Sequence, residues 1–204
     1  MIQKTSYGQG SPYMRGFTGF RNLLLIDGIR INNSVFREGP NQYWNTVDYL
    51  SIERLEVVKG PSSILYGSDS IGGSVNAITK HRTNYEEPWQ INPRVYYRFA
   101  SSGRSSSVRT EFSANYGSDF GAFGGFYYKY FGDIESGSDS NLLPRTGYYE
   151  LGGDIHFNIF LSEQAELEFA YYDLDQNNVW RTHRTIFAKS FHGTTVGNDL
   201  HLRY

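Results

Sequence analysis

Apolar and polar residues alternate over several stretches in the second half of the chain. From Val108 to Tyr116 the even positions carry valine, threonine, phenylalanine, alanine and tyrosine, whereas the odd positions carry arginine, glutamate, serine and asparagine. Residues 149–159 and 165–171 repeat this alternation, and residues 94–101 show it more weakly. Successive side chains of a strand point to opposite faces, so the pattern predicts β-strands and leaves little room for helices.

The lengths of these runs and of their connections indicate strands that cross a membrane. Transmembrane strands need about nine to eleven residues, whereas strands of globular proteins cluster near about five or six. Residues 117–119 and 162–164 are tight turns, while 132–147 and 176–195 are long and polar, an asymmetry typical of outer-membrane barrels. Residues 120–131 are aromatic on both faces, which leaves their register open. A soluble sheet with one wet face would alternate in the same way, so length and loop asymmetry decide.

Short apolar runs separated by turn residues characterise the first eighty residues. Leu23 to Ile26 and Ile29 to Ile31 flank Asp27-Gly28, a dipeptide that predicts a two-residue hairpin with a type I′ turn. The polar, glycine-rich stretch 5–22 before it is interpreted as a loop.

A second group of apolar runs surrounds a glycine-punctuated centre between Arg54 and Lys80. Pro61 suits the first position of a helix and Gly67 the residue past its end, which predicts a helical turn over residues 62–66. By themselves these residues indicate a βαβ corner of an α/β domain. Asp48 is expected to cap another helical turn over 49–54.

The long segment between these groups, residues 32–48, is too polar for a core but contains exposed aromatic residues beside amide and guanidinium donors. Such side chains can bind a ligand, although an ordinary long loop anchored by its rings is an equally weighted interpretation. The residues expected to contact a ligand are Arg37, Asn41, Gln42, Tyr43 and Trp44.

Three sequence blocks then resemble a known family. MRGF at 14–17, LLLIDGIRI at 23–31 and IERLEVVKGPSSILYGSDSIGGSVNAITK at 52–80 resemble, in order and spacing, the plug domain of TonB-dependent outer-membrane receptors. The positions that match the plug signature are Arg15, Gly16, Asp27, Gly28, Glu53, Glu56, Gly60, Pro61, Tyr66, Gly67, Gly72, Gly73 and Asn76.

This resemblance implies a partial α/β plug domain followed by antiparallel transmembrane β-barrel strands. We expect residues 1–80 to be the C-terminal part of the plug, 81–92 a linker and 93–204 the first barrel strands. About five complete strands and the start of a sixth, near 198–204, fit into this length, whereas a plugged transporter barrel needs about 22. The chain is therefore expected to be a fragment of such a receptor.

The resemblance also implies contacts and partners. Plug cations of the family contact carboxylates of the barrel lumen, and Arg15 and Lys59 occupy the matching positions. Lys59 stands where the family usually has arginine, so it keeps the charge but loses the forked geometry. Further implied partners are the TonB energy-coupling complex of the inner membrane, outer-membrane lipid, and a transported small ligand or haemoprotein.

Composition argues against several classes of partner and structural element. The formal net charge of −2 and the absence of a basic stripe argue against nucleic acid as a partner. The 17 tyrosines and 14 phenylalanines favour strands, and the absence of cysteine excludes disulfides and thiolate metal sites. No apolar run is long enough for a transmembrane helix, and the first ten residues lack the apolar region of a secretory signal.

Enzymatic and metal chemistry find little support in the sequence. The five histidines, His81, His156, His183, His192 and His201, form no HxxxH or HExxH motif, and we interpret them as solvated loop residues. Glu166 and Glu168 share a strand face, which alternation explains without catalysis, and no GxSxG elbow is present. We expect no catalytic residues, resident cofactor or metal.

The sequence thus predicts part of an outer-membrane receptor of a Gram-negative-type bacterium that takes up a scarce ligand, an iron compound such as haem or a ferric siderophore. FREGPNQY, at 36–43, resembles the haem branch of the family more than the vitamin B12 branch. A soluble, aromatic-rich β domain that binds carbohydrate is the alternative, and an enzyme with a glycine-rich cofactor loop is a more distant one.

Overall fold

A computed structural model describes residues 2–31, 44–80, 89–117, 119–135, 137, 142–162, 164–179 and 198–203. These residues separate into two compact units, the first comprising the described residues up to Lys80 and the second those from Trp89 onwards. Each unit has its own sheet, and each is described by itself.

The first unit is built on a four-stranded sheet with the order β4-β3-β6-β5. Its strands are β3 (Asn22–Ile26), β4 (Ile29–Arg30), β5 (Ile52–Lys59) and β6 (Gly73–Thr79). β3 pairs in parallel with β6, and the other pairs are antiparallel. Four consecutive apolar residues of β3, Leu23 to Ile26, are all buried and form the core with Val75 and Ala77. An uninterrupted apolar run in a central strand is what burial on both faces requires.

The predicted Asp-Gly hairpin is confirmed. Ile26 pairs with Ile29 across the two-residue turn, and Asp27 and Gly28 have φ values of 48° and 79°. Two successive positive φ angles define a type I′ turn, whose twist matches that of the flanking strands. The turn thereby fixes the register of β3 against β4.

The structure corrects two local predictions in this part of the unit. Part of the expected loop 5–22 pairs as strands, because β1 (Ile2–Ser6) and β2 (Gln9–Pro12) form a hairpin, and η1 (Gly19–Arg21) follows. Residues 49–54 do not form a helical turn: the Asp48 carboxylate accepts the Leu50 N–H at 3.1 Å, but pairing with β6 extends the chain from Ile52.

The predicted helical turn at 62–66 exists as α1 (Ser63–Tyr66), with a different beginning. Ser62, rather than Pro61, precedes the first helical residue as N-cap, so Pro61 lies outside the helix. Gly67 follows with a φ of 80°, as expected of a glycine past a helix end. In the described part of the chain, two short helical segments precede α1: η1 and η2 (Trp44–Thr46).

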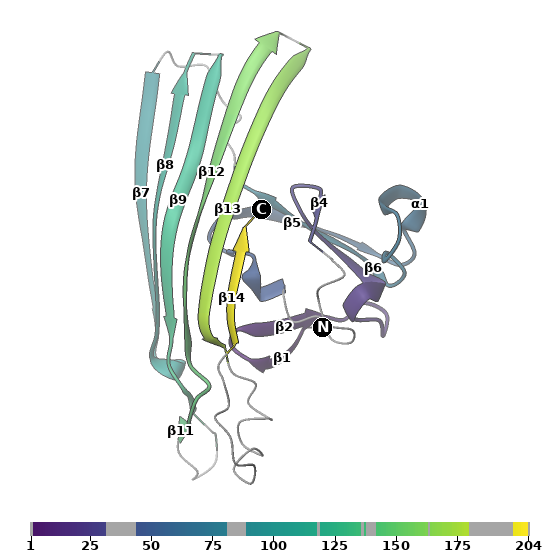
Figure 1. The fold of residues 1–204 in the computed structure, drawn as a ribbon, viewed down its shortest axis with the longest axis vertical. Coiled ribbons are helices and arrows are strands. Elements are labelled where there is room, and N and C mark those ends of the chain that lie inside the picture. Colours follow the sequence, from purple (N-terminus) through teal and green to yellow (C-terminus); the bar gives the residue numbers. More distant parts are fainter. Residues whose placement is uncertain are drawn as a thin grey trace. The chain divides into compact units, whose positions relative to one another are not determined.

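The second unit is a six-stranded antiparallel sheet in which most neighbours follow one another in the chain. Its order is β14-β13-β12-β9-β8-β7, and Figure 1 shows these strands side by side. The strands are β7 (Trp89–Ala100), β8 (Ser105–Tyr116), β9 (Phe120–Phe131), β12 (Tyr148–Ser162), β13 (Ala165–Val179) and β14 (Asn198–Arg203). The short η3 (Ser102–Arg104) precedes β8, and β10 (Ile134–Glu135) pairs with β11 (Leu142–Leu143) between β9 and β12.

The strands are longer than the alternating runs predicted. β7 begins at Trp89, inside the expected linker 81–92, and β13 continues to Val179, inside the expected long loop from residue 176. The tight turn at 117–119 is confirmed, since the Asp119 N–H donates to the Tyr116 carbonyl at 3.2 Å. The longest strands, β12 and β13, have 15 residues each. This length exceeds what most globular sheets use.

The two faces of this sheet differ in composition. The apolar face carries Phe112, Phe126, Leu151, Leu167 and Phe169, and all of them are exposed. The polar face carries Arg109, Lys129, Glu150, Asp154 and His156, and all of them are buried. The register left open for 120–131 is resolved, because Phe126 pairs with Gly153 and thus lies on the apolar face. Alternation is confirmed, but burial is the reverse of that in a soluble sheet.

None of the helices in the described part of the chain is long and apolar enough to cross a membrane.

Candidate functional site

A fully buried arginine organises the polar face of the strand sheet. Arg109 of β8 forms two parallel bonds with Asp154 of β12, Nη1 to Oδ1 at 2.8 Å and Nη2 to Oδ2 at 3.1 Å. Its Nε donates to Oε2 of Glu111 at 3.1 Å. A guanidinium presents its donors in a planar fork, so one cation binds two carboxylates.

Gly125 makes this contact possible. Arg109 and Asp154 lie on strands that β9 separates, and Gly125 of β9 is the residue paired with Asp154. A Cβ at Gly125 would lie 2.5 Å from Nη2 and 2.6 Å from Cζ of Arg109. The guanidinium therefore crosses β9 where a side chain is missing. Arg109 of β8 thus binds Asp154 of β12 across Gly125 of β9, and we call this contact between three adjacent strands the Arg109 bracket.

A second charged cluster lies on the same face. Nζ of Lys129 on β9 lies 2.9 Å from Oε1 of Glu150 on β12, and Nε2 of Gln176 on β13 donates to Oε2 at 2.6 Å. The ammonium also lies 4.2 Å from the centroid of the Tyr127 ring. Buried charges are stable only when paired and hydrogen-bonded, and both carboxylate oxygens of Glu150 have a partner.

The face continues to the edge of the sheet at β7. Arg94 lies 3.4 Å from the Glu111 carboxylate and donates to Oη of Tyr96 at 2.7 Å, with its own side chain mostly exposed. Glu111 thus receives one buried and one exposed arginine. Polar contacts run from β7 to β13 across the sheet.

His156 contradicts the prediction that the histidines are solvated loop residues. It lies in β12, fully buried, with Nε2 4.0 Å from Asp154 Oδ2 and Nδ1 4.0 Å from Glu168 Oε1. The ring of Tyr172 meets it edge-on at 5.2 Å. His201 lies in β14, and His81, His183 and His192 lie outside the described residues.

Within the part of the chain that the structure describes, no group of three or more histidine, aspartate or glutamate side chains is placed to hold a metal ion. Of the paired glutamates considered in the sequence, Glu166 accepts from Nδ2 of Asn158 at 2.6 Å, and Glu168 has about half of its side chain exposed.

In the first unit, several plug-signature residues meet at the Asp27-Gly28 turn. The two Asp27 oxygens accept the Thr79 N–H at 2.8 Å and the Thr79 hydroxyl at 2.6 Å. The Gly28 N–H donates to Oδ1 of Asn76 at 3.0 Å. These hydrogen bonds join the β3–β4 hairpin to the end of β6. The fold thereby brings together residues that are distant in the sequence.

Glycines of the signature permit close approaches in the same unit. A Cβ at Gly72 would lie 2.3 Å from Oδ1 of Asn22, and one at Gly73 would lie 2.3 Å from the Val58 carbonyl oxygen. Gly60 faces the Arg15 guanidinium, whose Nη1 would lie 3.1 Å from an added Cβ. Arg15 and Gly60 are therefore neighbours.

The remaining signature residues lie on the surface of the first unit. Lys59, Glu53 and Glu56 are exposed on β5, where Arg54 Nε lies 3.1 Å from Glu56 Oε1. Gly16 lies in the turn that Met14 and Phe17 close with reciprocal backbone bonds of 3.0 and 2.9 Å. Pro61, Tyr66 and Gly67 flank or form α1, and Tyr66 is exposed. The contacts predicted for Arg15 and Lys59 with barrel carboxylates stay a prediction.

Of the five residues predicted to contact a ligand, four lie outside the described residues: Arg37, Asn41, Gln42 and Tyr43. Trp44 begins η2 and is half-buried. Its role in ligand binding stays a prediction.

The charged pairs of the polar face were not predicted as pairs. Arg109, Glu111, Glu150 and Asp154 were recognised as polar positions of alternating strands. Which charges meet depends on the stagger of three hairpins. The available signal was the presence of opposite charges on strand faces beside glycine pairs such as 124–125 and 152–153.

Comparison with known proteins shows which proteins this chain is similar to. The family model described as TonB-dependent Receptor Plug Domain matches residues 1–74. The vitamin B12 transporter BtuB of Vibrio vulnificus is 44% identical over 69 residues, 34% of this chain and 11% of that protein. The iron-regulated outer membrane virulence protein of Vibrio cholerae is 43% identical over 87 residues, 40% of this chain and 13% of that protein.

Solved structures extend the similarity through the strand sheet. The copper transporter OprC has a TM-score of 0.73 at 17% identity, covering 87% of this chain and 26% of that one. The siderophore receptor PirA from Acinetobacter baumannii has a TM-score of 0.64 at 21% identity, covering 99% of this chain and 32% of that one. At these identities the likeness shows the fold. The chain spans only a minor part of the length of these relatives.

Proposed function

Because this chain belongs to the TonB-dependent receptors of the Gram-negative outer membrane, we propose that it supplies plug and barrel-wall segments of a transporter that takes up a scarce iron compound. Haem and ferric siderophores are the ligands proposed. Solved relatives described as siderophore receptors and the iron-regulated relative of Vibrio cholerae support this choice. None of the relatives named is an enzyme, which agrees with the expectation of no catalytic activity.

The observation that carries this proposal is the reversed burial of the strand sheet. Exposed phenylalanines and leucines occupy one face, and a buried, hydrogen-bonded set of charges occupies the other. In a transmembrane barrel the apolar face contacts lipid and the polar face lines the interior. A soluble carbohydrate-binding domain would require the opposite arrangement, so the structure favours the transporter.

Each unit has a proposed role in transport. The bracket of Arg109, Gly125 and Asp154 ties three strands into a rigid wall. The first unit is proposed to fill the interior of the barrel as residues 1–80 of a plug, with Arg15 and Lys59 facing lumen carboxylates and the loop around Trp44 facing the ligand. Energy from the TonB complex would then rearrange the plug.

A corrinoid is the second candidate ligand, because the BtuB of Vibrio vulnificus is 44% identical over 69 residues. That similarity covers 34% of this chain and 11% of that transporter. It therefore supports the transport class more strongly than the ligand.

Growth of cells that contain or lack the intact receptor tests the proposal. Cells with the receptor are expected to grow on haem or a ferric siderophore as sole iron source at concentrations at which cells without it do not. Cyanocobalamin-dependent growth of a methionine-requiring strain tests the corrinoid. Equal growth of both strains on all iron sources would refute iron uptake, and a receptor-dependent response to cyanocobalamin alone would replace it with corrinoid uptake.

A further inference from the structure

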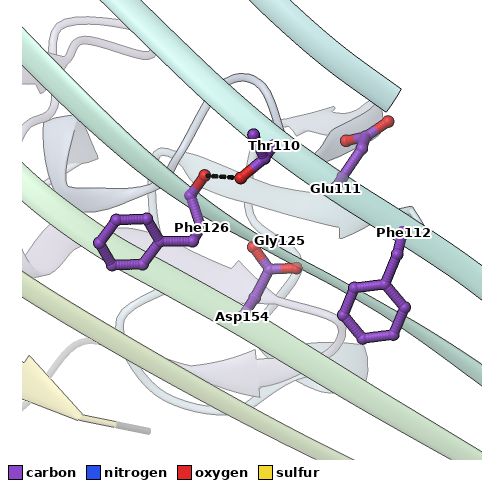
Figure 2. Close-up of a pocket in the computed structure, with 6 residues that line it drawn as sticks. All are labelled: Thr110, Glu111, Phe112, Gly125, Phe126 and Asp154. Carbon is purple, nitrogen blue, oxygen red and sulfur yellow. Dashed lines mark hydrogen bonds between the residues drawn. The ribbon is translucent and has the colours of Figure 1, made fainter. Parts of the chain in front are cut away.

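The apolar face of the strand sheet contains a hollow of about 360 Å³ near its middle. Six residues from β8, β9 and β12 line it, Thr110, Glu111, Phe112, Gly125, Phe126 and Asp154, and Figure 2 shows their arrangement. Phe112 and Phe126 are 40% and 56% exposed, so both rings stand at the surface.

The hollow exists because each phenylalanine has a glycine as its cross-strand partner on one side, while Pro93 and Thr110 are the partners of Phe112 and Phe126 on the other. Phe112 pairs with Gly124 of β9, and Phe126 pairs with Gly153 of β12. Cε1 of Phe112 would lie 3.2 Å from a Cβ at Gly124, and Cδ2 of Phe126 would lie 3.7 Å from one at Gly153. Each ring therefore leans towards a position without a side chain, and these glycines place no side chain between the two rings.

The polar groups around the hollow are occupied within the protein. The Thr110 hydroxyl donates to the Phe126 carbonyl oxygen at 3.4 Å (Figure 2). The carboxylates of Asp154 and Glu111 are bound by Arg109 on the polar face. A ligand at this place meets aromatic rings and satisfied backbone, which suits hydrocarbon and offers little to a charged head group.

We propose that this hollow, defined by Thr110, Phe112, Phe126 and the glycines opposite the two rings, holds one acyl chain of a phospholipid. The inference rests on the proposed function, in which the apolar face contacts the outer membrane. Phe112 and Phe126 both lie near the middle of their strands, at the depth of the acyl chains of a membrane and away from its head groups. An acyl chain, rather than a head group, is therefore the part of the lipid that occupies the hollow.

Photolabelling of the full-length receptor tests this site. The receptor is reconstituted into vesicles of phosphatidylethanolamine that carries a diazirine in the middle of one acyl chain, irradiated, and digested for mass spectrometry. We expect the peptides with Phe112 and Phe126 to be labelled several-fold more than the peptide with Leu167 and Phe169. The latter residues are 56% and 58% exposed on the same face, and provide an equally apolar comparison.

Thr110→Phe is the filling variant, because it places a ring beside Phe126 and keeps the surface apolar. Its expected effect is to lower labelling at Phe112 and Phe126 to the level of the β13 peptide. Val108→Phe, one cross-strand pair further along the same face, is the matched control and should leave labelling unchanged. Far-UV circular dichroism and receptor-dependent growth on haem or a ferric siderophore show whether both variants fold.

Equal labelling over the whole apolar face would overturn the site, as would undiminished labelling in Thr110→Phe. Preferential labelling by a lipid A probe would overturn the phospholipid assignment. Loss of the site with intact uptake leaves the proposed function standing, whereas absence of acyl-chain labelling anywhere on the face would contradict the membrane placement itself.

Discussion

The two sheets of this protein bury opposite kinds of residue. In the first unit, β3 buries Leu23 to Ile26 and the hydrophobic effect stabilises the sheet in the usual way. In the second unit, the buried face holds Arg109, Glu150 and Asp154, while phenylalanine and leucine are exposed. The same secondary structure thus buries apolar side chains in one unit and paired charges in the other. The kind of residue that a sheet buries therefore indicates the surroundings to which the sheet is suited.

The largest expected effect is the loss of the Arg109 bracket. Arg109→Leu leaves the buried carboxylate of Asp154 without its arginine and leaves Glu111 with only the exposed Arg94, and removing one partner of a buried pair costs about 3–5 kcal/mol. Chemical unfolding of the reconstituted receptor measures this change. Arg94→Leu is the matched control, because Arg94 is a mostly exposed arginine on the same carboxylate and its loss should be far smaller. Equal losses of unfolding free energy in both variants would show that the buried arginine contributes no more to stability than the exposed one.

The next effect concerns the core of the first unit. Leu24→Ala removes a fully buried side chain and should lower the free energy of unfolding by about 2–5 kcal/mol. Leu167→Ala, at a 56% exposed position of the second unit, should cost much less in the folded receptor. Thermal unfolding of the two variants, followed by circular dichroism, gives the comparison. A larger loss at Leu167 would reverse the distinction between the two sheets.

The smallest effect is local, at the turn between β3 and β4. Asp27→Ala removes both acceptors of Thr79, which is expected to destabilise the unit by about 1–3 kcal/mol. Asp27→Asn retains one acceptor and tolerates the positive φ, so its effect should be smaller. Hydrogen exchange of the Thr79 amide reports the change directly. Unchanged protection in Asp27→Ala would mean that the carboxylate does not fasten the hairpin to β6.

Much of the fold could be predicted because its signals are local. Asp27-Gly28 specifies its own turn, and residues such as 108–116 specify strand faces through neighbouring positions. The β1–β2 hairpin was missed because Gln9 to Pro12 lacks the alternating pattern. Pro61 lies two positions before Ser63, the first helical residue of α1, because Ser62 takes the N-cap position between them.

The candidate site could be predicted only in part. Arg109 and Asp154 are separated by a strand, and their meeting depends on the register of two hairpins and on the missing side chain of Gly125. The sequence predicts a solvated His156 because the histidines form no HxxxH or HExxH motif, whereas its burial comes from the sheet face it occupies. Contacts between residues that are far apart in the sequence leave no pattern among neighbouring positions.

The most direct test of the reversed sheet is the cost of a charge on its apolar face. Phe169 lies between Leu167 and Tyr171 on that face and is 58% exposed. If lipid covers it, Phe169→Arg should lower the free energy of unfolding of the reconstituted receptor by about 2–4 kcal/mol, and Leu161→Arg, beside the tight turn, by about 0–1 kcal/mol. If both arginines change it by no more than about 0.5 kcal/mol, as on a solvated surface, the face does not contact a membrane.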